Sequence, residues 1–437
     1  MDLPKLLIIS QPFNNDTGGG ITLSNLFLGW DREKLAVICS GYLLENNIDT
    51  SYCSNYYQIG HKEEKWMFPF SLFKRKYHSG VVRFDHRKIQ NLSFEKSKLR
   101  LKLISKYFTP LLNYTCLVHF CKRLHLSVEM INWIKEFDPD LFYIQAGGRE
   151  KILFCNELNS YFKKPVVFHM MDDWPSILSE LGIFGKYWEK KIDREFKVLL
   201  NNSSLLLSIC EEMSLEYQAR YNMTFIPFHN PVDVNIWKAN QKGNYEINGS
   251  PTVLYAGRVG LGIDDSLQSI AKAIDKVNRE SGSSIKFLLQ VGNEPAWGKL
   301  YDCVVVKELV DYEELPKVFS NADILILPYD FSEKAFKFIR YSMPTKASEY
   351  MISGTPIIVF APKDTAIVKY AERYNWAEVI TENSYIKVAE VIRELINNKE
   401  KRVKIAKNAV AIAEGKHDAR YIREEFRKLI TSVTVVN

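Results

Sequence analysis

The stretch Tyr341-Ser-Met-Pro-Thr-Lys-Ala-Ser-Glu-Tyr-Met-Ile-Ser-Gly-Thr-Pro-Ile-Ile-Val-Phe360 combines a turn, a short helix and an apolar strand. Pro344 disfavours helix in the residue before it, and Thr345 is positioned to cap the helix that follows. Gly354 ends that helix, and a buried strand comes next. The amides of a helix N-terminus bind phosphate, and a carboxylate one turn in, here Glu349, accepts hydrogen bonds from sugar hydroxyls. The stretch therefore predicts one half of a nucleotide-sugar site.

The region before this stretch alternates strands with helices. A strand at Thr252–Ala256 leads into Gly257 and Arg258, and a strand at Ile285–Val291 leads towards Asn293. Such alternation predicts an open parallel sheet with helices on both faces. Ligands bind these sheets at the carboxyl ends of the strands, so Gly257, Arg258 and Asn293 are candidate ligand-binding residues.

The beginning of the chain has a related layout. A strand at Leu6–Ile9 is followed by Gly18, Gly19 and Gly20, and then by a helix from about Ile21 to Leu28. This order brings backbone amides close to an anion. The sequence matches neither the GxGxxG fingerprint nor a P-loop, which needs a lysine. A simple flexible turn is therefore an equally good interpretation of the three glycines.

The length of 437 residues predicts two domains, because it exceeds what one hydrophobic core usually supports. Residues 239–251 are polar and rich in turn formers, which is typical of a linker. We expect two Rossmann-like α/β domains, an acceptor-binding one at 1–238 and a nucleotide-sugar-binding one at 239–415. A C-terminal helix at 416–437 is expected to pack back on the first domain. Residues 41–60 read as a loop.

Positive charge is concentrated in one region. The whole chain carries a net charge of +6, too little to predict nucleic-acid binding, whereas Lys62–Lys102 alone contains twelve Lys or Arg and four Asp or Glu. Aromatic residues are interleaved with these cations, and residues 98–108 have an amphipathic helical pattern. Residues 60–135 are either a solvated insertion, or a surface that meets an anionic membrane through residues 62–106.

Cysteine usage and the absence of long apolar stretches predict the compartment. Seven cysteines are scattered without any CxxC pair, which is typical of a reducing compartment. The spacing of Cys116, His119 and Cys121 fits no usual zinc site, and we expect no bound metal. No run of eighteen apolar residues occurs, and the N-terminus reads as a strand rather than a signal peptide. We expect a cytoplasmic protein, peripheral on the inner face of the plasma membrane.

The motifs together resemble a known family, the GT-B glycosyltransferases. The resemblance is carried by the glycine loop, the two doubly wound halves, and three runs in the second half of the chain. These runs are Ile226-Pro-Phe-His-Asn-Pro-Val-Asp233, Val253-Leu-Tyr-Ala-Gly-Arg258 and the Ser348–Pro356 stretch. The chain is most similar to the retaining group called family 4, the glycosyl transferases group 1. The resemblance covers the chain except about residues 45–135.

The resemblance implies roles for single residues of the C-terminal domain. Glu349 matches the second glutamate of a pair and would bind the ribose hydroxyls of the donor, with Thr345 beside it. Tyr341 stands where the first glutamate of the pair contacts the donor sugar, which leaves the sugar undetermined. Arg258 matches the arginine that binds the donor diphosphate. The lysine expected a few residues later is absent, and Lys346 or Arg340 is the candidate for the second cation.

Resemblance also implies roles in the N-terminal domain. Gly18 to Gly20 match the loop that approaches the donor diphosphate. A histidine or a His-Asp pair follows a central strand in this family, and here that place holds His169 and Asp172. The alternative interpretation is that Asp172 or Asp173 caps a helix and that His169 is a core residue.

These features imply a retaining, metal-independent glycosyltransferase without a cofactor. It would move a sugar from a UDP- or GDP-sugar to a glycan or lipid-linked acceptor in cell-surface polysaccharide synthesis, with Arg258, His169, Asp172 and Lys346 as catalytic residues. Two alternatives stay open. A nucleotide-sugar epimerase shares the architecture, and a catalytically degenerate binding protein would explain Tyr341 and the missing lysine.

Overall fold

The computed structural model describes residues 3–15, 17–45, 48–68, 70–73, 76–85, 88–89, 102, 104–180, 182–260 and 262–435. The chain divides into two compact units. The N-terminal unit comprises Met1–Phe228 and Arg423–Asn437, and the C-terminal unit comprises His229–Ile422. Each is described by itself.

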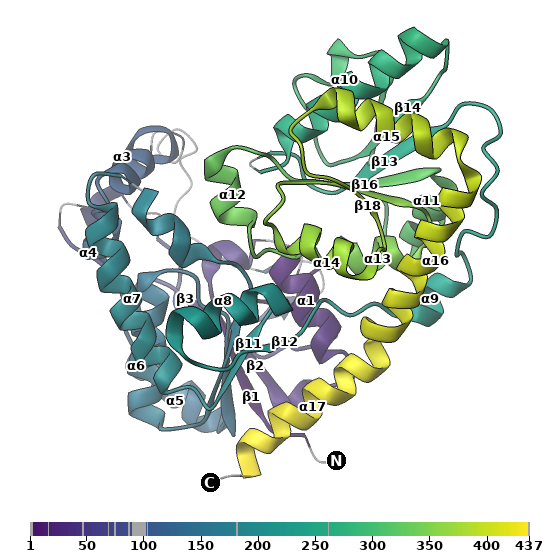
Figure 1. Cartoon of the computed structure of the whole chain (residues 1–437). Coiled ribbons are helices and arrows are strands. Elements are labelled where there is room, and N and C mark those ends of the chain that lie inside the picture. Colours follow the sequence, from purple (N-terminus) through teal and green to yellow (C-terminus); the bar gives the residue numbers. More distant parts are fainter. Residues whose placement is uncertain are drawn as a thin grey trace. The chain divides into compact units, whose positions relative to one another are not determined.

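An eight-stranded sheet organises the N-terminal unit (Figure 1). Its strands are parallel except the edge strand β5, which runs antiparallel to β3. In sheet order they are β12 (Ile226–Pro227), β11 (Leu205–Ser208), β10 (Val166–Met170), β9 (Leu141–Ile144), β1 (Leu6–Ile9), β2 (Leu35–Ser40), β3 (Tyr56–Ile59) and β5 (Gly80–Val82). The central strands are continuous apolar runs because helices cover both faces of the sheet.

Helices and short helical turns connect these strands. The α-helices are α1 (Gly18–Phe27), α3 (Thr109–Tyr114), α4 (Val118–Cys121), α5 (Val128–Phe137), α6 (Arg149–Phe162), α7 (Gly185–Asn201) and α8 (Glu211–Tyr221). The short turns are η1 (Arg32–Lys34), η2 (Gly41–Leu43), η3 (Phe70–Phe73), the π-helical η4 (Ile104–Phe108) and η5 (Trp174–Glu180).

The prediction of a loop at residues 41–60 is wrong, because this segment contains β3. Tyr56 and Tyr57 in that strand are fully buried and pair with Val37 and Ile38 of β2. Both faces of β3 are buried, so its residues do not alternate between apolar and polar, and the usual strand signal is missing.

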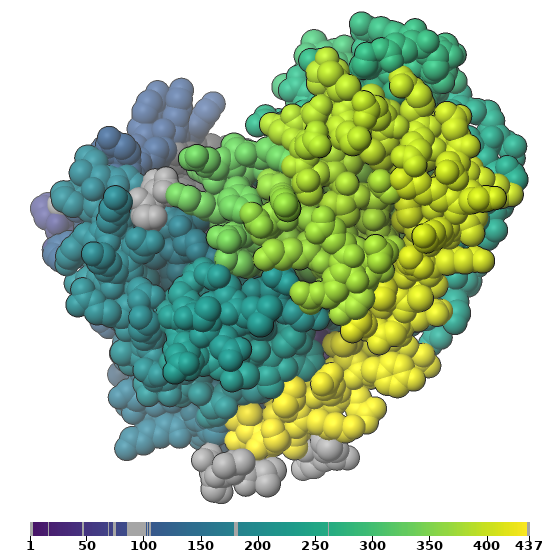
Figure 2. Space-filling view, in the orientation of Figure 1, coloured from purple at the N-terminus to yellow at the C-terminus, as the bar shows by residue number. Residues whose placement is uncertain are grey.

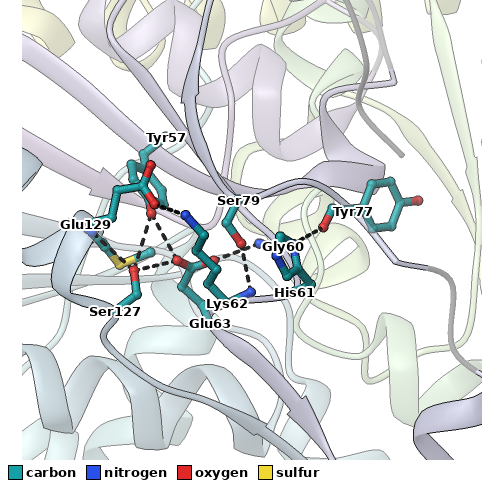
Figure 3. A network of polar contacts seen from close by, with 10 residues as sticks. Tyr57, Gly60, His61, Lys62, Glu63, Tyr77, Ser79, Ser127 and Glu129 are labelled. Carbon is teal, nitrogen blue, oxygen red and sulfur yellow. Dashed lines mark hydrogen bonds and ion pairs between the residues drawn. The ribbon is translucent and has the colours of Figure 1, made fainter. Parts of the chain in front are cut away.

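The start of the basic region is tied to the sheet by a polar network (Figure 3). Glu63 is fully buried, and its carboxylate accepts hydrogen bonds from Tyr57 Oη at 2.9 Å, Ser127 Oγ at 2.6 Å and Gly60 N at 3.0 Å. Three donors offset the cost of burying a carboxylate. Lys62 beside it forms an exposed ion pair with Glu129, which adds little to stability.

Two small antiparallel sheets lie in the same region. They pair β4 (Glu64–Trp66) with β8 (Lys122–Leu124), and β6 (Phe84–Asp85) with β7 (Lys88–Ile89). Residues 109–124 form α3, α4 and β8. The amphipathic pattern of residues 98–108 rests largely on residues 98–101 and 103, which lie outside the described residues.

A six-stranded parallel sheet organises the C-terminal unit (Figure 1). In sheet order its strands are β15 (Val304–Lys307), β14 (Lys286–Gln290), β13 (Thr252–Ala256), β16 (Ile324–Pro328), β17 (Ile357–Phe360) and β18 (Glu378–Ile380). The α-helices are α9 (Val234–Lys238), α10 (Asp264–Ser281), α11 (Leu315–Asn321), α12 (Glu333–Ile339), α13 (Lys346–Ile352), α14 (Ala366–Tyr374), α15 (Tyr385–Asn397) and α16 (Lys399–Lys416), with short turns η6 (Gly298–Leu300) and η7 (Tyr312–Glu314).

The polar segment at 239–251 is bonded to the C-terminal unit rather than free. Lys242 N donates to Ser353 O at 2.9 Å, and Gln241 Nε2 donates to Ile352 O at 2.8 Å. Tyr245 Oη donates to Gly354 O at 3.1 Å. The compact units divide between Phe228 and His229, so the segment expected to be a linker lies inside the C-terminal unit.

The last helix, α17 (Ala419–Val435), belongs to the N-terminal unit from Arg423 onwards. Arg423 Nε donates to Asn25 O at 2.7 Å. Phe426 is fully buried, and its ring lies 5.2 Å from that of Phe27 and 6.1 Å from that of Tyr143. Burial of one phenylalanine contributes about 1.5–3 kcal/mol, which holds this helix on α1 and β9.

All seven cysteines are buried and unbridged. No helix among the described residues is both long enough and apolar enough to cross a bilayer.

Candidate functional site

The loop after β13 forms the first part of the candidate site in the C-terminal unit. Gly257 has a φ of +143°, a backbone conformation that residues with a Cβ rarely adopt. A Cβ at this position would overlap Lys346 Nζ. The next side chain, Arg258, is exposed, while its carbonyl oxygen accepts a hydrogen bond of 2.6 Å from Tyr255 Oη. Glycine at 257 therefore lets the lysine ammonium lie directly against the end of β13.

Lys346, the first residue of α13, supplies that ammonium. Its Nζ donates to Ala256 O at 2.6 Å and lies 4.1 Å from the centroid of the Tyr255 ring. Burial lowers the pKa of Lys346 to about 7; Glu349 opposes this shift, and Arg258 adds to it. A lysine with so low a pKa takes up a proton when an anion binds beside it, because the anion favours the charged form.

Glu349 lies three residues after Lys346 on the same helix, which places the two side chains on one face. Glu349 is buried, and only 7% of the residue is exposed. Burial raises its pKa to about 7, and Lys346 opposes this shift. Within the described part of the chain, no donor forms a hydrogen bond to its carboxylate. A buried carboxylate without donors is costly, so hydroxyl groups of a ligand would offset that cost.

Hydrogen bonds hold α13 against β13 and the segment that follows β12. Tyr350 is fully buried, and its Oη accepts a hydrogen bond of 2.8 Å from Ala256 N. Ser348 Oγ donates to Asn230 O at 3.1 Å, and Asn230 Nδ2 donates to Thr345 O at 3.2 Å. Lys346 and Glu349 are therefore presented by a helix that is fixed at its start and through its buried face.

Thr345 stands at the start of the helix, as the sequence predicts, but its side chain does not cap it. Its backbone is helical, with φ −55° and ψ −35°, and its side chain forms no capping hydrogen bond. A capping side chain requires an extended backbone at that residue. The carbonyl of Pro344 instead accepts from Ala347 N at 3.0 Å, which continues the turn.

Tyr341 is a buried residue, only 5% exposed. The guanidinium of Arg340 lies over its ring at 5.2 Å from the centroid, and Arg340 itself is exposed. Of the two candidates for the second cation, Lys346 is the one whose ammonium lies beside Gly257. It is also close enough to Arg258 for charge repulsion to lower its pKa.

Asn293 follows β14, the parallel neighbour of β13, and is exposed. Gly257 N donates to Gln290 O at 3.0 Å, which joins the ends of the two strands. Arg258 and Asn293 thus leave adjacent strands at the carboxyl edge of the sheet, where ligands of such sheets bind.

In the N-terminal unit the three glycines are the first turn of α1 rather than a loop before a helix at Ile21. Thr17 caps this helix by accepting from Gly20 N at 3.1 Å. A Cβ on Gly20 would overlap the buried side chain of Asn14. Gly18 and Gly19 donate their amides to no acceptor among the described residues, so both are available to an anion.

His169 lies in the core of the N-terminal unit. It belongs to β10, is 1% exposed, and forms a hydrogen bond of 2.5 Å between its Nδ1 and Tyr143 Oη. Burial lowers its pKa to about 4, so the ring is neutral at physiological pH. This placement fits the second sequence interpretation, a core histidine, rather than a side chain that touches substrate.

Asp172 and Asp173 have different surroundings although they are adjacent. Asp172 is exposed beyond the end of β10. Asp173 is buried, and its carboxylate accepts from Arg220 Nη1 at 2.9 Å and Nη2 at 3.1 Å, from Tyr217 Oη at 2.7 Å, and from Ser176 Oγ. Asp173 therefore joins η5 to α8, whereas the side chain of Asp172 is exposed.

Comparison with known proteins identifies the C-terminal unit. The family model described as glycosyl transferases group 1 matches residues 250–398. That range includes Gly257, Arg258, Asn293, Lys346 and Glu349. This part of the C-terminal unit is therefore similar to the glycosyl transferases group 1 family. A comparison with curated proteins found no match.

Solved structures resemble the chain along nearly its full length. The HepE protein of Anabaena in complex with UDP and glucose has a TM-score of 0.58 at 14% identity, covering 98% of this chain and 100% of its own. Sucrose-phosphate synthase from Thermosynechococcus elongatus has a TM-score of 0.63 at 12% identity, covering 99% of both chains. A UDP-forming alpha,alpha-trehalose-phosphate synthase from Burkholderia vietnamiensis has a TM-score of 0.59 at 11% identity, covering 98% and 100%. These likenesses show the GT-B fold, as the sequence predicts.

Four residues that support the candidate site of the C-terminal unit were missed in the sequence: Asn230, Tyr255, Ser348 and Tyr350. Tyr255 ends a strand and Tyr350 follows Glu349, positions close to predicted ligand-binding residues. Neither position reveals the hydrogen bond that its hydroxyl forms. Tyr255 Oη donates to the carbonyl of Arg258 three residues later, and Tyr350 Oη accepts from Ala256 N, 94 residues away in the sequence.

Proposed function

We propose that this protein is a glycosyltransferase that takes a sugar from a nucleotide-diphosphate donor. One observation carries the proposal. In a glycosyl transferases group 1 domain, Lys346 and Glu349 lie on one turn of α13, and the lysine ammonium is packed against Gly257 beside Arg258. That arrangement combines cations for a diphosphate with a buried carboxylate for hydroxyl groups.

The proposed roles follow from charge. When the bond between the anomeric carbon and the diphosphate breaks, negative charge grows on the leaving phosphate oxygen, and nearby cations stabilise it most at the transition state. Arg258 and Lys346 supply these cations, without a metal in the proposed scheme. Glu349 accepts hydrogen bonds from the ribose hydroxyls, and Asn293 and the Thr345 backbone line the nucleotide.

In the N-terminal unit, the proposal assigns the amides of Gly18 and Gly19 to an anionic oxygen. Asp172 is assigned to the acceptor, because it is exposed beyond the carboxyl end of a central strand. His169 is given a supporting role through Tyr143 rather than contact with substrate, since it is buried.

The proposed reaction retains configuration at the anomeric carbon. The acceptor oxygen forms its bond on the face from which the diphosphate leaves, and the acceptor's proton passes to the leaving phosphate. We propose a glycan or lipid-linked acceptor at the inner face of the plasma membrane, in cell-surface polysaccharide synthesis. UDP or GDP donors fit the proposal, and the similar structures of HepE with UDP and with UDP-glucose support UDP first.

A donor screen tests this function. Hydrolysis or transfer of UDP-, GDP- and dTDP-sugars would be measured for the wild type, Arg258→Ala and Glu349→Ala. Both variants should lose at least about tenfold in kcat/KM, because each removes a charged hydrogen bond. Activity like that of the wild type in both would overturn the site assignment.

The buried Tyr341 favours one alternative, a protein that binds a nucleotide-sugar without transferring it. Tight binding of a nucleotide-sugar together with no turnover on any acceptor would support this alternative. Conversion of the donor sugar without an acceptor would instead indicate an epimerase.

A further inference from the structure

Exposed apolar side chains of the N-terminal unit gather on three short segments. These segments, residues 67–68 with 70–72, residues 107–120 and residues 183–187, are called the apolar face below. They hold eleven of the twenty-three large hydrophobic residues that are exposed in the described part of the chain. Phe68 is 79% exposed, Tyr114 60% and Phe184 55%. A concentration of this kind in so few residues marks an interaction surface.

Backbone contacts join the three segments into one surface. Ile183 N donates to Tyr114 O at 3.1 Å, which joins the third segment to the second. Met67 N donates to Cys121 O at 3.1 Å, and the rings of Phe70 and Phe108 lie 6.0 Å apart, which joins the first to the second. Figure 1 draws α3, α4 and α7 together at one edge of this unit, and in Figure 2 the blue atoms of α3 project from it.

The approach of the second and third segments is close. Gly182 has a φ of +127°, and a Cβ on it would overlap the carbonyl oxygen of Tyr114. The neighbouring side chains of Ile183 and Tyr114 are nevertheless 65% and 60% exposed. The backbones of the two segments are thus packed together, while these apolar side chains remain exposed to solvent. Packing of the backbones fixes where the side chains lie on the surface.

The charge at this face is positive. Its three segments contain the exposed Lys186 and no carboxylate, and the exposed Lys106 comes directly before the second segment. Lys65 is exposed just before the first segment. The nearest acidic residues along the chain are Glu64, which lies 3.7 Å from Lys122, and Glu180 and Glu189 on either side of the third segment.

We propose that the apolar face docks on an anionic lipid bilayer. Tyrosine and phenylalanine suit the headgroup level of a bilayer, where the ring meets apolar chains and the polar atoms stay hydrated. Lysines beside them are attracted to anionic lipids. A second copy of this chain would place the same lysines opposite one another, and like charges disfavour that pairing.

This membrane contact extends the proposed function and rests on it. A transferase with a lipid-linked acceptor would bind the membrane that holds that acceptor. It also differs from the sequence interpretation, which assigned membrane contact to residues 62–106. Most of the face lies at residues 107–120 and 183–187, whose apolar side chains are separated in sequence and joined only by folding.

Sedimentation with vesicles tests the proposal on the full-length protein. Vesicles of phosphatidylcholine, with and without phosphatidylglycerol, would be used without any donor or acceptor, so the result is independent of transfer. The face variant combines Phe68→Ser, Tyr114→Ser and Phe184→Ser. The control variant combines Leu215→Ser, Leu300→Ser and Ile386→Ser, whose side chains are exposed elsewhere to a similar extent.

The wild type and the control variant should bind phosphatidylglycerol vesicles alike. The face variant should bind at least about tenfold more weakly, because three apolar side chains no longer enter the interface. Lys106→Gln and Lys186→Gln should each weaken binding about fivefold at low salt. Circular dichroism melting would confirm that each variant is folded.

Three outcomes would overturn the proposal. The first is a wild type that does not sediment with phosphatidylglycerol vesicles at low salt, where the attraction is strongest. The second is equal binding by the folded face and control variants. The third is a dimer in light scattering that the face variant abolishes while vesicle binding is absent, which would assign the face to a second copy.

Discussion

Replacing Gly257 by alanine should move the Lys346 ammonium without greatly changing the rest of the C-terminal unit. The new Cβ would overlap Lys346 Nζ, and this atom is the end of a flexible side chain that can swing away from Ala256 O. The main cost to stability is the backbone, because a φ of +143° is a region nearly confined to glycine. Such strain costs about 1–3 kcal/mol.

The effect on donor binding should be separate from this strain. A charge-assisted hydrogen bond contributes about 1.5–3 kcal/mol, so losing the lysine from the diphosphate should weaken binding about tenfold to about a hundredfold. Calorimetric titration with UDP, or with GDP if the donor screen selects it, measures this change. Differential scanning calorimetry measures the change in Tm.

Gly260→Ala is the matched control for Gly257→Ala. Gly260 lies in the same loop with a φ of +132°, but a Cβ on it would meet no atom within 4 Å. Both variants should lose similar stability, and only Gly257→Ala should lose nucleotide affinity. Equal losses of affinity in the two variants, or no loss in a folded Gly257→Ala protein, would refute the role given to Lys346.

Three further predictions concern the same helix. UDP-sugar binding should weaken as pH rises through about 7, because Lys346 then loses its proton while the diphosphate diester does not titrate; Lys346→Met should bind weakly with a flat pH profile in the same calorimetric titration. Glu349→Gln should raise the Tm at pH 8 by a few degrees. The raised pKa of Glu349 stabilises the fold below about pH 4.5, and this contribution is lost as the pH rises through about 7. Calorimetric scans should show a smaller gain in Tm at pH 5. An equal gain in Tm at both pH values would contradict the burial argument, and so would the same gain in the exposed-site variant Glu372→Gln. Tyr350→Phe should lower the free energy of unfolding by about 1–3 kcal/mol in denaturant titration, because the buried Ala256 N–H loses its acceptor; an unchanged free energy would show that the amide finds another.

Local patterns predicted much of the fold. Strands such as Leu6–Ile9 and Thr252–Ala256 appear within a residue of their predicted bounds because an apolar run between turn formers has few other stable conformations. The errors lie where local pattern and tertiary environment differ. The strand β3 lacks alternation because both of its faces are buried, and residues 239–251 look like a linker although they are bonded to the C-terminal unit.

The candidate site divides in the same way. Arg258, Lys346 and Glu349 could be proposed from sequence because charged residues beside strand ends and helix starts are visible in spacing alone. Burial was not visible. Nothing local distinguishes His169, enclosed in the core, from Asp172, exposed three residues later. Periodicity reports which face of an element is apolar, but not which neighbours cover it.

By itself, the sequence determined the two α/β halves, the resemblance to GT-B glycosyltransferases and the residue types available for a diphosphate. These follow from short-range preferences, since periodicity and turn chemistry act over a few residues. Only the tertiary structure decided that the Lys346 ammonium lies beside Gly257, that Glu349 is buried without a hydrogen-bond donor from the described residues, and that three distant segments form one apolar face. Those properties depend on packing between segments far apart in the chain, and packing sets distance, burial and pKa.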